Sequence, residues 1–152
     1  MSIPGLERLE AWSKSMDFTL RIYREVLPLL PPEEKWSLNQ QMRRSAQSIP
    51  ANIVEGYGRY YYQENVRFCY VARGSLDELL SHLVVAHQIG CIPSELFKQL
   101  AEQGNDLVRL INGYIAYLKR SKQGANEPGA LNVIREDQAS LYVDDGDIIP
   151  DL

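Results

Sequence analysis

The chain has 152 residues, of which 45% are hydrophobic, and its formal net charge is −4. This length supports one domain with a sizeable core and is too short for two domains that each have a core of that kind. No apolar run approaches the roughly 20 residues of a membrane span, and the first residues lack the basic-then-apolar layout of a signal peptide, so the sequence predicts a soluble, cytoplasmic protein.

Charge is unevenly distributed along the chain. Residues 1–122 carry 15 Lys and Arg against 13 Asp and Glu, whereas residues 123–152 carry one Arg against seven acids. Within the first part, residues 43–73 hold five arginines against two glutamates, so positive charge is concentrated there. The sequence therefore predicts a slightly basic body, residues 1–122, followed by an acidic C-terminal tail, residues 123–152.

Four helical patterns follow one another in the body, and no strand pattern competes with them. Apolar residues recur at three- and four-residue steps from about residue 6 to 29, where a cluster of prolines ends the stripe. The second pattern begins at Pro32 and runs to Gly56, the third starts within "RYYYQENVRF" and stops at Gly90, and the fourth opens at "PSEL" and continues to Leu118. Because short connections place consecutive helices antiparallel, the sequence predicts an all-α, up-down-up-down antiparallel four-helix bundle with an acidic C-terminal extension.

Two segments carry a family resemblance. The order "QMRRSAQSIPANIVEGYGR", then "FCYVARGSLDELLSHL", then a last apolar helix resembles the small four-helix-bundle proteins encoded within intervening sequences of bacterial large-subunit ribosomal RNA genes. The resemblance covers about residues 6–120. Such proteins are similar, more distantly, to the accessory bundle of diversity-generating retroelement reverse transcriptases. The resemblance implies a noncatalytic bundle that assembles into a homopentameric ring.

The first of these segments places a proline inside a helix. Pro50 cannot donate to the carbonyl of Ala46, four residues earlier, so we expect a hinge here and a freed carbonyl that needs a partner. The hydroxyls of Ser45 and Ser48 and the amide of Asn52 lie within one turn, and we expect one of them to supply the hydrogen bond.

Ser45, Ser48, Asn52 and Glu55 follow one another at three- and four-residue steps, so they form a polar stripe on the helix. It lies beside the stripe of apolar residues that includes Ile49 and Ile53. A carboxylate in that position needs a cation or several donors, and we expect it to pair with Arg73 of the third helix, inside the bundle or between subunits. Gly56 and Gly74 would let the second and third helices approach closely at this level. The predicted hinge and buried polar stripe comprises Ser48, Pro50, Asn52, Glu55, Gly56, Arg73 and Gly74.

An enzymatic interpretation would make Glu55 a general base, which needs a nucleophile, an electrophile site or a metal nearby. His82 and His87 are five residues apart, so they lie on different faces of a helix and fail the spacing of helical metal ligands. No phosphate-cradling glycine loop and no HExxH motif is present. The sequence therefore predicts no enzyme, no metal site and no cofactor.

Tyrosines and arginines gather around the junction of the second and third helices. Such side chains stack on single-stranded bases and are equally enriched in protein interfaces, and we favour the interface. The candidate nucleic-acid or partner surface comprises Arg43, Arg44, Arg59, Tyr60, Tyr61, Tyr62 and Arg67. A second, subunit-facing apolar surface is expected from Phe18, Trp36, Val54, Tyr70 and Phe97.

Two functions fit these observations. The first is an oligomeric scaffold or accessory subunit for a nucleic-acid-processing protein partner such as a reverse transcriptase. The second is a self-sufficient RNA-binding ring. Both predict a homo-oligomer, with a pentamer favoured by the resemblance, and neither involves a membrane.

Overall fold

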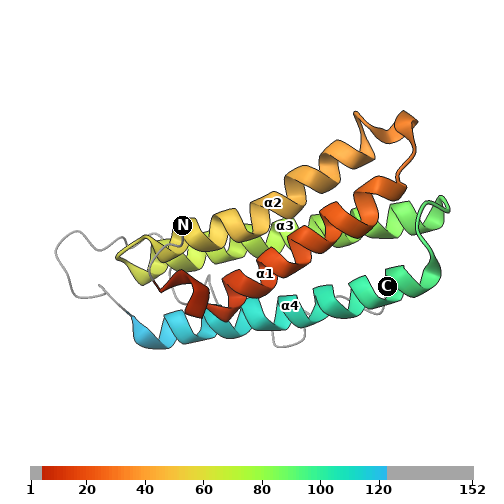
Figure 1. The fold of residues 1–152 in the computed structure, drawn as a ribbon. Helices are drawn as coiled ribbons and strands as arrows, with labels where there is room; N and C mark the ends of the chain where they lie inside the picture. Colours follow the sequence, from red (N-terminus) through yellow and green to blue (C-terminus); the bar gives the residue numbers. More distant parts are fainter. Residues whose placement is uncertain (1–4, 123–152) are drawn as a thin grey trace.

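The computed structural model describes residues 5–122, and every regular element in this range is a helix (Figure 1). Four long helices lie along a common direction, and helices that follow one another in the chain run antiparallel. They are α1 (Glu10–Arg21), α2 (Leu38–Tyr57), α3 (Tyr62–Gln88) and α4 (Ser94–Ser121). The predicted four-helix bundle is confirmed. The predicted acidic extension, residues 123–152, lies outside the described residues, and the boundary at residue 122 stays a prediction.

One apolar face of each long helix is buried in a shared core. The largest side chains with almost no exposed surface are Phe18, Ile22, Met42, Ile49, Ile53, Leu76, Leu79, Leu80, Leu83, Leu100, Ile111 and Ile115. Two residues expected on a subunit-facing surface belong to the interior instead. Phe18 is fully buried, and the buried Phe97 stacks on the ring of His87 with 4.3 Å between centroids. Within residues 5–122, no helix is both long and apolar enough to span a membrane.

The first predicted helix is interrupted at both ends. A 3₁₀ turn, η1 (Leu6–Arg8), precedes α1, while a π-helical segment, η2 (Ile22–Val26), and a second 3₁₀ turn, η3 (Leu27–Leu29), follow it. Pro28 has no N–H to give to the carbonyl of Arg24, so the α-helical hydrogen-bond pattern is broken here, and the chain leaves the α-helix through a π-helical segment and a 3₁₀ turn. The predicted range is helical except at Leu9, but its last two turns are not α-helical.

The second predicted helix begins later than expected. Residues Pro32–Glu34 form only one 3₁₀ turn, η4, and α2 starts at Leu38. The carboxylate of Glu34 accepts hydrogen bonds from the Leu38 N–H, at 3.3 Å, and from the Ser37 hydroxyl. Glu34 therefore satisfies a free N–H of the first turn of α2 from outside the helix, in the manner of a capping residue.

The carbonyl freed by Pro50 has a partner that the sequence did not indicate. Helix α2 continues through the buried Pro50, and the carbonyl of Ala46 accepts a hydrogen bond of 2.8 Å from the hydroxyl of Thr19 on α1. The expected local donors are engaged elsewhere: Ser45 donates to backbone carbonyls of its own helix, and Asn52 donates to Ser48. The prediction of a local donor was wrong, because the bundle brings a side chain from another helix to this carbonyl.

We expect Thr19→Val to lower the free energy of unfolding by about 1–2 kcal/mol, since a buried carbonyl loses its donor while the shape of the side chain is kept. Thermal or urea unfolding of the variant at matched protein concentration measures the effect. Ser13→Val on the same helix is a comparison, because the Ser13 hydroxyl bonds to the exposed carbonyl of Glu10. Equal stability of the Thr19 variant and the parent would show that water replaces the hydroxyl.

Candidate interface on helices α2 and α3

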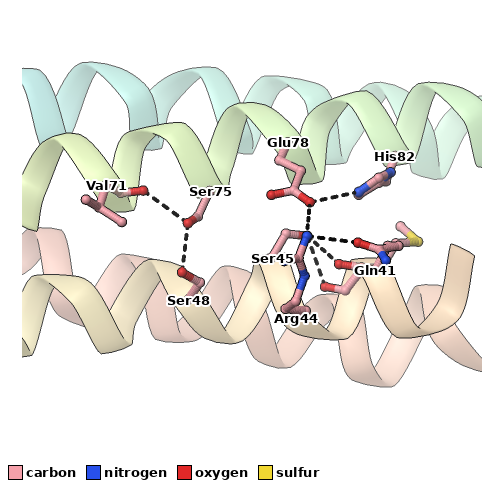
Figure 2. Close-up of polar contacts among 9 residues, drawn as sticks. Gln41, Arg44, Ser45, Ser48, Val71, Ser75, Glu78 and His82 are labelled. Carbon is pink, nitrogen blue, oxygen red and sulfur yellow. Dashed lines mark hydrogen bonds and ion pairs between the residues drawn. The ribbon is translucent and has the colours of Figure 1, made fainter. Parts of the chain in front are cut away.

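A polar seam joins α2 to α3 between their apolar contacts (Figure 2). The hydroxyls of Ser48 and Ser75 lie 2.8 Å apart, and Ser75 also donates to the carbonyl of Val71 at 3.0 Å. The amide of Asn52 donates to both the carbonyl and the hydroxyl of Ser48, at 2.7 and 2.9 Å. Ser48 of the predicted polar stripe therefore links α2 to α3, and Asn52 of the same stripe orients the Ser48 hydroxyl from within α2.

One turn further toward the start of α2, a charged network crosses the same seam (Figure 2). Arg44 donates to Glu78 at 2.8 Å and to Gln41 at 3.0 Å, and His82 lies 3.4 Å from the same oxygen of Glu78. Because 68% of the Arg44 side chain is exposed, solvent screens this ion pair, and we expect it to contribute less than about 1 kcal/mol. Its main effect is to hold Arg44 in one orientation on the surface.

The structure does not form the expected pair of Glu55 and Arg73 within the bundle. Glu55 is 53% exposed and pairs with Arg59 one turn along α2 at 2.7 Å, whereas Arg73 donates to Asn112 of α4 at 2.9 Å. Ser75 faces α2, and Arg73 precedes it by two residues, about 200° around the helix, so Arg73 points toward α4. The version of this prediction in which the pair joins two subunits stays a prediction.

Since Glu55 has an exposed partner, we expect Glu55→Ala to change the free energy of unfolding by less than about 0.5 kcal/mol. Urea titration of the variant gives this value directly. Asp106→Ala, which removes the similarly exposed partner of Arg109, should behave alike. A loss of several times that size in Glu55→Ala alone would point to burial of Glu55 in an assembly.

Gly56 and Gly74, both expected where α2 and α3 approach closely, have different surroundings. A Cβ on Gly56 would lie 2.7 Å from Oδ1 of Asn65 and 2.9 Å from Cβ of Phe68, so α2 and the start of α3 do approach closely there. A Cβ on Gly74 would meet nothing within 4 Å. The role expected for Gly74 was wrong, because it lies on the exposed face of α3.

Asn65 anchors this close approach. Its amide donates to the hydroxyl of Tyr114 on α4 at 3.1 Å, and its Oδ1 accepts from the thiol of Cys69 at 3.6 Å. Burial raises the pKa of Tyr114 to about 12, although the hydrogen bond from Asn65 acts against this, and burial raises the pKa of Cys69 to about 12. Burial therefore favours the protonated form of both groups at neutral pH, and Cys69 packs in the core as a small apolar side chain.

The predicted arginine and tyrosine surface divides into two regions. Arg43 and Arg44 lie near the start of α2, and Arg59 follows its end, about 22 Å further along the axis at 1.5 Å per residue. Arg43 lies over the ring of Tyr23 at 5.2 Å and so faces η2 rather than α3. The seven residues therefore do not form one patch.

At the second region, the junction of α2 and α3, aromatic rings and cations meet. Tyr60 is 53% exposed and contacts Tyr61 edge to face with centroids 5.1 Å apart. Arg59 lies over the ring of Phe68 at 5.2 Å, Tyr62 packs against the core, and Arg67 is exposed. This junction is the part of the predicted surface that the structure brings together.

A shallow groove between α1 and α4 was not indicated by the sequence. It has a volume of about 360 Å³ and is lined by Glu10, Lys14, Asp17, Gln103, Asp106, Leu107 and Leu110. Asp106 is paired with Arg109 at 2.9 Å. Among residues 5–122, no group of three His, Cys, Asp or Glu side chains is placed to hold a metal ion.

The protein is therefore an antiparallel four-helix bundle. Polar side chains join its helices α2 and α3. The chain belongs to the 23S rRNA-intervening sequence protein family, whose model matches residues 7–113. This agrees with the resemblance carried by the two sequence segments.

A solved structure has the same fold. The crystal structure of a protein of unknown function from the S23 ribosomal protein family of Bacteroides thetaiotaomicron is similar with a TM-score of 0.63 and 23% sequence identity, covering 69% of this chain and 97% of that chain. At this identity the likeness shows the fold alone. No curated protein matches the chain.

Proposed function

We propose that the protein is a noncatalytic oligomeric bundle that serves as a scaffold or accessory subunit for a nucleic-acid-processing partner such as a reverse transcriptase. The observation that carries this proposal is the outer face of α2 and α3. It exposes the apolar Val71, 48% exposed, together with Ala51 and Arg44. Arginine beside exposed apolar side chains is typical of protein interfaces.

The seam below this face supports the same role. The hydrogen bond between Ser48 and Ser75 links the two helices, and the ion pair with Glu78 orients Arg44 on the surface above them. A surface that is already ordered before binding loses less conformational entropy when a partner covers it. The α2–α3 face is therefore suited to a stable contact, either with another copy of the chain or with a protein partner.

Light scattering and co-purification test the proposal. We expect a closed homo-oligomer, with a pentamer as the first expectation, that retains a co-expressed reverse transcriptase. Val71→Glu should disrupt one or both contacts, whereas Leu20→Glu on α1, which adds the same charge at a similarly exposed apolar residue, should disrupt neither. A monomer at micromolar concentration, or equal effects of the two variants, would contradict the proposal.

A further inference from the structure

Cations and aromatic rings from distant parts of the sequence meet where the first half of α3 lies beside the end of α4. We define this α3–α4 patch as Arg67, Tyr70, Arg73, Lys119 and Arg120. The guanidinium carbon of Arg73 lies 5.5 Å from the centroid of the Tyr70 ring, and Nζ of Lys119 lies 5.9 Å from the same centroid. Arg67 is three residues before Tyr70 and so shares its helix face. The fold thus arranges cations around one half-buried ring.

The patch contains a hollow of about 250 Å³ lined by Tyr70, Arg73, Gly74 and Asp77. Gly74 leaves the approach to this hollow open, since a Cβ there would meet nothing within 4 Å. Glycine in a helix interior costs about 1 kcal/mol relative to alanine, and no close contact within the described residues explains it here. The hollow is therefore open beside Tyr70, and a base that stacks on the face of this ring takes the place of Arg73 or Lys119, which lie over it.

The charge of the patch is mainly positive. The patch has four cations, and the nearby acids are Asp77, which lines the hollow with Arg73, and Glu64, one turn before Arg67. Arg67 and Arg120 are exposed, and neither has an ion-pair partner in the described part of the chain. Arg73 is held in place by its hydrogen bond to Asn112. The patch therefore combines one fixed cation with exposed ones around an aromatic ring.

We propose that the α3–α4 patch binds single-stranded nucleic acid, with its cations contacting phosphates and with bases stacking on Tyr70 and on the exposed Tyr117, three residues before Arg120. A duplex can meet the same cations, but its bases are already stacked and cannot enter the hollow. The inference rests on the nucleic-acid-processing role proposed above and names the contact that the protein itself makes. It needs no protein partner.

Fluorescence anisotropy of the full chain with a labelled single strand of RNA tests the patch, with the same sequence as DNA and as a duplex alongside. In Arg67→Gln/Arg120→Gln, we expect affinity to fall about tenfold at low salt, which is roughly 1.4 kcal/mol. The slope of log affinity against log salt should fall by about 1.4, because each phosphate contact on a single strand contributes roughly 0.7. Stronger binding of RNA than DNA identifies RNA as the ligand, and the reverse identifies DNA.

The matched control is Arg24→Gln/Lys98→Gln, which removes the same charge from exposed residues near the opposite end of the bundle. We expect it to retain the parent's affinity within about twofold, well inside the tenfold that 1.4 kcal/mol represents. Circular dichroism checks that both variants fold. Equal weakening by both variants, equal binding of duplex and single strand, or no binding by the parent at low salt overturns the proposal. Assembly is measured separately, so a ring that binds no nucleic acid overturns this inference and leaves the scaffold proposal standing.

Discussion

Gly56→Ala is expected to lower the free energy of unfolding by about 3 kcal/mol, the upper part of the range for overpacking a close contact. The added Cβ would lie 2.7 Å from Oδ1 and 3.0 Å from the backbone carbonyl oxygen of Asn65, and 2.9 Å from Cβ of Phe68. None of these atoms is the free end of a flexible chain. Asn65 is held by Tyr114 and Cys69, so relief requires movement of the first turn of α3.

Gly74→Ala is the matched control, because the same change is made on the same pair of helices where no atom lies within 4 Å. It should raise stability by about 0.5–1 kcal/mol, the helix-propensity difference between the two residues. Thermal unfolding of both variants at one protein concentration gives the comparison. If both substitutions raised the stability, the close packing around Gly56 would be contradicted. If both lowered it, Gly74 would be covered by another subunit in the assembled protein.

The long helices were predictable from the sequence because their signals are local. The periodic apolar residues of α3 and α4 mark their buried faces, and Gly90, with a φ of +81°, lies just after the end of α3 as expected. The observed helix ends differ from the predicted ones where prolines change the hydrogen bonds of neighbouring turns. Pro28 alters the end of the first helix, and the cluster around Pro32 delays the start of α2 until Leu38.

The candidate sites were less predictable because their contacts depend on how helices rotate against one another. Thr19 and Ala46 are far apart in sequence, and only the packing of α1 on α2 places the hydroxyl at the freed carbonyl. Arg73 was expected to face α2, but Ser75, two residues later, contacts α2, and Arg73 donates to Asn112 of α4 instead. Nothing in the sequence assigned Lys119 to a site, because its contact with Tyr70 depends on how α4 packs beside α3.

The acidic tail, residues 123–152, bears on nucleic-acid binding through its charge, although it lies outside the described residues 5–122. The chain carries a net charge of −4 with these residues and +2 without them. We expect the tail to lie against residues 43–73 or a neighbouring subunit and to restrain indiscriminate nucleic-acid binding. A tail that only solubilises the protein is the alternative.

Deleting residues 123–152 should therefore raise the affinity for a single strand about tenfold at low salt, roughly 1.4 kcal/mol. The gain should shrink as salt is added, because the Debye length falls from about 30 Å at 0.01 M to about 10 Å at 0.1 M. A full-length variant with all seven tail acids changed to Asn or Gln separates charge from chain length, and it should match the deletion if repulsion of the polyanion is the cause. Anisotropy at two salt concentrations, with light scattering to show that the oligomer is intact, measures the effect. Unchanged binding after deletion would show that the tail exerts no restraint, because removing six net negative charges per chain would then leave the field at the binding surface unaltered.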